Sequence, residues 1–226
     1  MPTASALIRG ASFYRSNLGN KLVMAITGFV LFLFVIEHLA GNLLIYAGAS
    51  EINSYAAFLE RTGDLLWAAR AILLTALMLH IISATKTTIA NWRARPTWYV
   101  MKRDIRTNYA ARTMIVSGPL VLLFVIYHVL QFDFLVTGPG YEHTNVYRNM
   151  VLAFRVPYIS AIYILANLSL GAHLWHGGWS MLHTVGISNP RYGILRRIVV
   201  PLVAAIITTG FISIPIAALA GALPLQ

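Results

Sequence analysis

Five long apolar segments, separated by polar connections, constrain this chain more than any other feature of its sequence. They cover residues 22–46, 65–85, 113–132, 156–182 and 198–220. As helices rising about 1.5 Å per residue, they can each cross a hydrocarbon core about 30 Å thick. With 58% hydrophobic and only 11% charged residues, the chain is neither an ordinary soluble globule nor disordered. The sequence therefore predicts an all-α membrane protein: one domain over residues 1–226, folded as a bundle of five transmembrane helices.

Basic residues concentrate on one side of the predicted bundle. If the spans alternate in direction, the N-terminal segment shares a side with the second and fourth connections. That side holds 13 basic residues against one acidic residue, Asp104, whereas the other two connections hold 3 basic and 5 acidic residues. Because positively charged connections stay in the cytoplasm, we expect a cytoplasmic N-terminus and an outward C-terminus. The formal charge of +10 is then a mark of membrane topology, and no nucleic-acid partner is expected.

Histidines are the main candidates for chemistry, because the chain has no cysteine. The missing cysteines exclude disulfides, thiolate-bound iron–sulfur clusters, cysteine zinc sites and covalently attached haem. A lone histidine in a membrane is explained about equally well by a hydrogen bond to a neighbouring hydroxyl or carbonyl. Six of the seven histidines nevertheless lie in or near the spans: His38, His80, His128, His173, His176 and His183.

Depth sorts these histidines into two layers. His38 and His128 both lie roughly 25 Å from the inner boundary, counted from the nearest basic residue of their spans. They also end an internal repeat, because residues 27–38 and 117–128 are identical at six of twelve places. His80 lies about 9 Å from the inner boundary, and His173 and His176 lie about 10–15 Å from it. The sequence thus predicts one outer pair and one inner pair, each drawn from two helices.

Two haem b groups explain this arrangement, because a low-spin haem takes two axial imidazoles and helix bundles build such sites from facing helices. A proton or ion path also uses histidine and glutamate chains, and a transporter typically shows inverted repeats. The repeat found here is parallel, and the only acidic residue within a span is Glu37. Zinc fits poorly, because no three or four ligands share one depth and face.

Taken in order, these motifs resemble a known family over nearly the whole chain. The chain is similar to the five-helix dihaem cytochrome b anchor subunit of succinate:quinone oxidoreductases, the succinate dehydrogenases and fumarate reductases. The resemblance rests on residues in the first four spans, in the first connection and, with Gly186, in the fourth connection. They are Thr27-Gly28, Glu37-His38-Leu39, Asn42, the run Asn53-Ser54-Tyr55-Ala56-Ala57-Phe58-Leu59-Glu60, His80, His128, His173-x-x-x-Gly177, Trp179-Ser180 and Gly186.

The resemblance implies specific ligands and partners. His38 and His128 would bind the outer haem and His80 and His173 the inner haem, with His176 as an alternative ligand or a neighbour of one. A flavoprotein subunit and an iron–sulfur subunit would dock on the cytoplasmic face of a bacterial cytoplasmic membrane, leaving no dicarboxylate chemistry on this chain. Menaquinone, or ubiquinone as the alternative, would react near the outer haem, where a carboxylate accepts protons.

Three questions stay open at this point. Glu60 and Glu37 are the candidates for the quinone-linked carboxylate, although an exposed acidic residue in a connection is ordinarily only solvated. A cytochrome b subunit of a formate dehydrogenase or hydrogenase is the nearest alternative function. A small membrane transporter without a cofactor is an alternative from another class.

Overall fold

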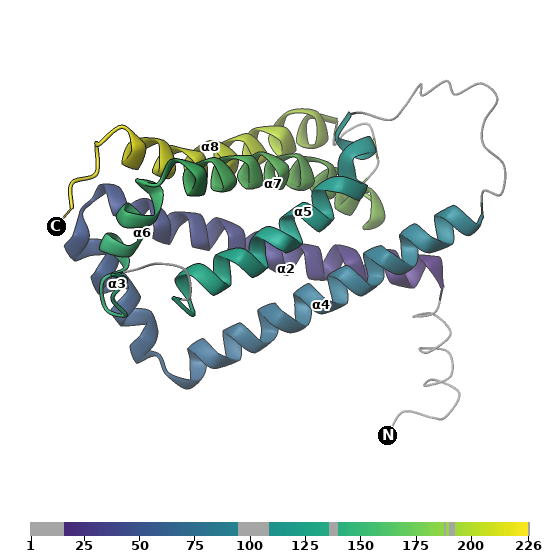
Figure 1. The fold of residues 1–226 in the computed structure, drawn as a ribbon. Coiled ribbons are helices and arrows are strands. Elements are labelled where there is room, and N and C mark those ends of the chain that lie inside the picture. The colour runs from purple at the N-terminus through teal and green to yellow at the C-terminus, as the bar shows by residue number, and fades with distance from the viewer. Residues whose placement is uncertain (1–15, 95–108, 136–139, 188, 190–192, 226) are drawn as a thin grey trace.

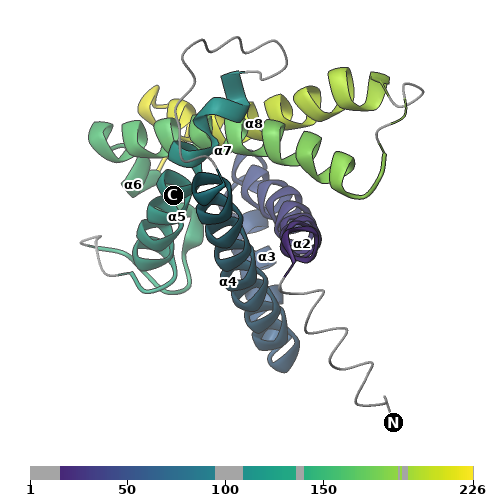
Figure 2. The ribbon, with the colours of Figure 1, turned by 90° about the vertical axis from the view of Figure 1, so that its right-hand side faces the viewer.

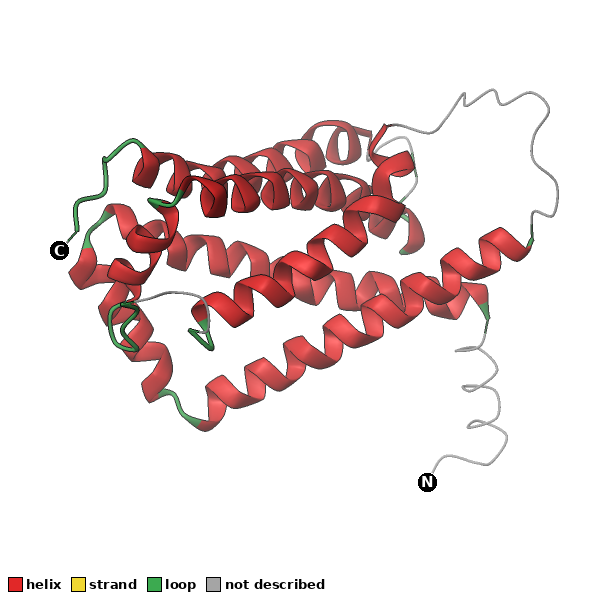
Figure 3. Ribbon diagram, in the orientation of Figure 1, coloured by secondary structure: helices red, strands yellow, loops and turns green. Residues whose placement is uncertain are grey.

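A computed structural model describes residues 16–94, 109–135, 140–187, 189 and 193–225, and all regular structure in them is helical (Figure 3). Five of the helices are long and apolar enough to cross a membrane. The prediction of an all-α, multi-pass membrane protein is thereby confirmed. The long helices are α2 (Asn17–Leu43), α4 (Asp64–Arg93), α5 (Tyr109–Phe132), α7 (Pro157–Thr184) and α8 (Val200–Leu219), the last preceded by the π-helical turn η3 (Leu195–Val199).

The long helices lie lengthwise beside one another, as Figure 1 shows. One end of the bundle carries the start of α2, the end of α4 and the start of α5, and we call it the N-terminal end. The opposite end carries two short helices, α3 (Ala49–Arg61) and α6 (Val146–Phe154), together with the C-terminus, and we call it the α3–α6 end. Figure 2 shows α7 and α8 side by side above α2.

The helix bounds differ from the predicted spans in two ways. The second span was expected to end at residue 85, but α4 continues to Arg93, because residues 86–93 contain neither glycine nor proline to stop it. The first and third connections each contain a short helix that the sequence analysis does not predict. Helix α3 lies between Gly48 and Gly63, two glycines with positive φ that turn the chain on either side of it. Asn145 caps the start of helix α6, because its side chain accepts a hydrogen bond from the Arg148 amide at 3.1 Å.

The densest apolar packing lies at the α3–α6 end. There α6 is buried almost entirely, against the ends of α7 and α8 and against the 3₁₀ turn η1 (Leu44–Tyr46). Asn53 joins α3 to α6 by donating to Asn145 Oδ1 at 3.1 Å and accepting from the Tyr147 amide at 3.0 Å. This end is therefore a fixed cap on the bundle, which holds the helix ends near it in position.

Several residues behind the predicted orientation lie outside the described part of the chain. They include Arg9, Arg15, Arg95, Lys102, Arg103, Asp104, Arg106 and Arg191. The cytoplasmic position of the N-terminus stays a prediction.

Candidate functional site

His38 and His128 meet near the α3–α6 end of the bundle. His38 lies on α2 and His128 on α5, and their ring centroids are 5.6 Å apart with the planes at 85°. Aromatic rings surround them: Phe34 stacks on His38 with centroids 5.3 Å apart, and Phe124 lies 5.8 Å from His128. The two ends of the sequence repeat thus reach the same point in the bundle from different helices.

His80 and His173 meet nearer the N-terminal end. They lie on α4 and α7, and their ring centroids are 6.2 Å apart with the planes at 67°. A glycine lies against each ring: a Cβ on Gly28 would come within 3.1 Å of His80 Cε1, and one on Gly118 within 3.8 Å of His173 Cε1. These glycines occupy equivalent places in the sequence repeat. Helices α2 and α5 therefore supply histidines to one pair and glycines to the other.

The two pairs lie at different heights in the bundle. Gly28 marks the height of His80 on α2, and His38 follows it ten residues later. On α5 the same ten residues separate Gly118, beside His173, from His128. Ten helical residues span about 15 Å, so both helices place the two histidine pairs about 15 Å apart along the helix axes.

The distance within each pair matches two imidazoles that bind one metal ion from opposite sides. A metal–imidazole nitrogen bond is about 2 Å long, and the ring centroid lies about 1 Å behind the nitrogen, so the centroids should be about 6 Å apart. The measured distances are 5.6 and 6.2 Å. Among the described residues there is no cluster of three or more histidine, cysteine or acidic side chains. Pairs of imidazoles without further ligands fit haem iron, whose other four ligands come from the macrocycle.

In each pair, one histidine has a hydrogen-bonding partner at its Nδ1 atom, which leaves Nε2 as the atom that could bind iron. His80 Nδ1 lies 3.1 Å from the Met24 carbonyl oxygen, which can only accept, so Nδ1 carries the proton and Nε2 keeps its lone pair. His128 Nδ1 lies 3.1 Å from the Tyr163 hydroxyl. His173 Nδ1 is buried and has no hydrogen-bond partner among the described residues. The donor set of both pairs fits two bis-imidazole haem groups.

His176 makes its ring contact outside the His80–His173 pair. Its ring stacks on Trp179 with centroids 6.3 Å apart, and Trp179 stacks in turn on His183 at 5.9 Å. The structure therefore brings His173, and not His176, to His80. The remaining histidine, His143, is exposed in the connection between α5 and α6.

Glu37 and Glu60 lie in different surroundings. Glu60 is exposed near the end of α3, and its carboxylate has no partner among the described residues. Glu37, next to His38 in the apolar span, is exposed as well, but its carboxylate shares a hydrogen bond with the Tyr55 hydroxyl of α3. Burial, the charge of Glu37 and this bond all raise the pKa of Tyr55, so the phenol stays protonated and donates to the carboxylate. Gly41 makes room for this contact, because a Cβ there would come within 2.6 Å of Tyr55 Cε1.

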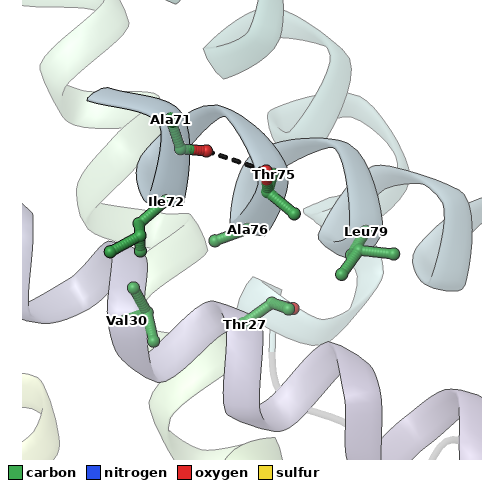
Figure 4. Close-up of a pocket in the computed structure, with 7 residues that line it drawn as sticks. All are labelled: Thr27, Val30, Ala71, Ile72, Thr75, Ala76 and Leu79. Atoms are coloured by element: carbon green, nitrogen blue, oxygen red, sulfur yellow. Dashed lines mark hydrogen bonds between the residues drawn. The ribbon is translucent and has the colours of Figure 1, made fainter. Parts of the chain in front are cut away.

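An apolar groove of about 350 Å³ runs between α2 and α4 (Figure 4). Thr27, which lines it next to Gly28, places the groove at the height of the His80–His173 pair, and its other α2 residue, Val30, lies two helical turns before Glu37. Figure 4 shows the residues that line it from the two helices: Thr27, Val30, Ala71, Ile72, Thr75, Ala76 and Leu79.

Comparison of the chain with protein-family models, with curated proteins and with solved structures finds no match. The functional argument therefore rests on the residues and their geometry. Sequence reasoning missed Tyr55 and Tyr163. Tyr55 lies within the 53–60 run that supports the resemblance, whereas nothing in the local sequence distinguishes Tyr163 from the other tyrosines near membrane ends.

Proposed function

We propose that this chain is the membrane-anchor cytochrome b subunit of a succinate:quinone oxidoreductase, carrying electrons between an iron–sulfur subunit and a quinone through two haem b groups. The observation that carries the proposal is the presence of two histidine pairs at different heights in the bundle. Each pair comes from two helices, and the ring centroids within the pairs are 5.6 and 6.2 Å apart. Four imidazoles in two layers are the ligand set of two six-coordinate haem groups without covalent attachment.

Each haem b, when bound, supplies an iron centre that takes up and releases one electron. The chain's own residues hold the two groups at fixed heights: His80 and His173 nearer the N-terminal end, His38 and His128 nearer the α3–α6 end. Phe34 and Phe124 pack beside the second pair and keep water away from it. A site that excludes water and is fixed by rigid helices changes little in geometry when its charge changes.

Quinone reacts near the His38–His128 pair in this proposal. Reduction of a quinone to a quinol takes two electrons and two protons, and the reverse reaction releases them, so the site needs a group that exchanges protons. Glu37 lies next to His38 and is hydrogen-bonded to Tyr55, which makes it the first candidate for this group. Glu60 remains the second candidate for this proton-accepting carboxylate. Menaquinone is the proposed substrate, with ubiquinone as the alternative.

The partners follow from what the chain lacks and from its charge. The sequence has no cysteine to hold iron–sulfur clusters, so in this proposal those centres belong to an iron–sulfur subunit, which exchanges electrons with a flavoprotein subunit in succinate oxidation or in fumarate reduction. The N-terminal segment and the connections on its side hold 13 basic residues and suit an acidic partner surface. We place these subunits on the cytoplasmic face of a bacterial cytoplasmic membrane.

Haem analysis of histidine variants, together with the subunits that co-purify, tests the proposal. Purified wild-type chain should show the reduced-minus-oxidised absorbance of haem b. His80→Ala and His38→Ala should each keep one haem, while the control His143→Ala should keep both. Co-purification of a flavoprotein and an iron–sulfur protein with succinate:quinone activity would support the complex. A wild-type chain without haem would refute the proposal in favour of a transporter, and co-purification of a formate dehydrogenase or hydrogenase subunit would assign another complex.

A further inference from the structure

A chain of hydrogen bonds leads away from His128 toward the α3–α6 end. His128 Nδ1 lies 3.1 Å from the Tyr163 hydroxyl, which donates to Gln131 Oε1 at 3.0 Å. Gln131 Nε2 in turn donates to the Tyr141 hydroxyl at 3.2 Å. These bonds join α5, α7 and the connection between α5 and α6.

The direction of these bonds determines which nitrogen of His128 carries the proton. The Tyr163 hydroxyl has one proton and gives it to Gln131, so its oxygen can only accept from His128. Nδ1 of His128 is then the N–H group, and Nε2 keeps the lone pair that an iron ligand needs. If the Gln131 amide were reversed, Tyr163 would donate to His128 and leave Nε2 protonated. Gln131 therefore selects the tautomer through Tyr163.

The arrangement is fixed by burial. Tyr163 is 5% exposed and Gln131 is 0% exposed, so neither can exchange its bond for one with water. The Tyr163 ring packs edge-on against Phe154 and Phe124, with centroids 4.8 and 4.9 Å away. A buried polar pair without its partners would be costly, which makes the complete chain of bonds the stable state.

We propose that Tyr163, oriented by Gln131, is the positioning residue of His128: it accepts the Nδ1 proton, presents Nε2 to the iron and strengthens the imidazole as a ligand. The inference rests on the proposed haem function. An imidazole whose N–H donates to oxygen is more basic at its other nitrogen and so stabilises the oxidised iron. The bond therefore lowers the midpoint potential of the haem held by His38 and His128, and that of the other haem is unaffected.

The test is a redox titration of the purified protein carrying Tyr163→Phe, followed by the haem absorbance. Tyr127→Phe is the matched control, because its ring lies 6.1 Å from that of Tyr163 in the same aromatic cluster and its hydroxyl has no bond to His128 in the described residues. We expect Tyr163→Phe to keep two haem groups and to shift one midpoint potential upward, with the other unchanged. Tyr127→Phe should titrate like the wild type.

The outcomes separate this inference from the proposed function. A wild-type chain without haem refutes both. Two haem groups in Tyr163→Phe with wild-type potentials, or an equal shift in Tyr127→Phe, overturns the role of Tyr163 alone. If Tyr163→Phe does not accumulate in membranes, Gln131→Leu decides by the same titration: it should shift the same potential upward, and an unchanged potential would overturn the inference.

Discussion

Replacing Gly28 with alanine offers a stringent test of the geometry at the His80–His173 pair, because the sequence repeat supplies its own control. A Cβ on Gly28 would come within 3.1 Å of His80 Cε1 and 3.3 Å of His80 Nδ1. These contacts are shorter than ordinary van der Waals distances, so the imidazole must shift by a few tenths of an ångström. The shift strains the 3.1 Å bond from His80 to the Met24 carbonyl.

The expected magnitude follows from overpacking, because the gain in helix propensity on replacing glycine by alanine is the same with and without haem. Overpacking of this kind costs about 1–3 kcal/mol. This cost raises the free energy of the state that holds His80 in place, and it corresponds to a loss of about 5–150-fold in affinity for one haem. A Cβ on Gly118 would lie 3.8 Å from His173 Cε1, which is an ordinary van der Waals contact. Gly118→Ala should therefore leave haem affinity unchanged.

Competition for haem with excess apomyoglobin measures this affinity in detergent solution. Gly28→Ala should release one of its two haem groups at a lower competitor concentration than the wild type, while Gly118→Ala should match the wild type. Equal behaviour of the two variants would refute the reasoning, because their positions in the repeat are equivalent and only the distance to the imidazole differs.

Three further predictions concern the ligands, the quinone site and the cap. His173→Ala should lose one haem and His176→Asn should keep both, as counted by haem content; the reverse result would exchange their roles. Glu37→Gln should slow quinone turnover with both haem groups retained, because the amide cannot exchange protons; an unchanged rate would exclude Glu37. Asn53→Ala should lower the free energy of unfolding by about 1–3 kcal/mol, because it leaves the Tyr147 amide without its partner. The control Ser54→Ala, at an exposed position, should not lower it. Equal melting temperatures of the two variants would contradict this prediction.

The fold could be predicted from the sequence because a membrane leaves few choices. Each apolar segment must satisfy its own backbone hydrogen bonds, so five segments of sufficient length become five helices. Helices α3 and α6 were missed because hydropathy detects only segments long enough to span a membrane. Their amphipathic faces pack on the bundle end, and such contacts depend on residues distant in sequence, as with Asn53 and Asn145.

Although depth did not separate His173 from His176, the helices that pair their histidines could also be predicted, because depth along a helix follows from residue number alone. The contacts that orient the histidines could not. Tyr163 lies 35 residues from His128 and Met24 lies 56 residues from His80, and both bonds depend on how neighbouring helices are rotated about their axes. For the same reason, the bond of Glu37 with Tyr55 required the position of α3, which the sequence did not reveal.

The ratio of haem to protein in the purified wild-type chain tests the central claim most directly. A pyridine haemochrome assay, combined with amino-acid analysis for the protein concentration, counts non-covalent haem b without reference to any partner subunit. The two histidine pairs predict two haem b per chain. A ratio of one would leave one pair without a ligand-binding role, and a ratio of zero would contradict the account as a whole.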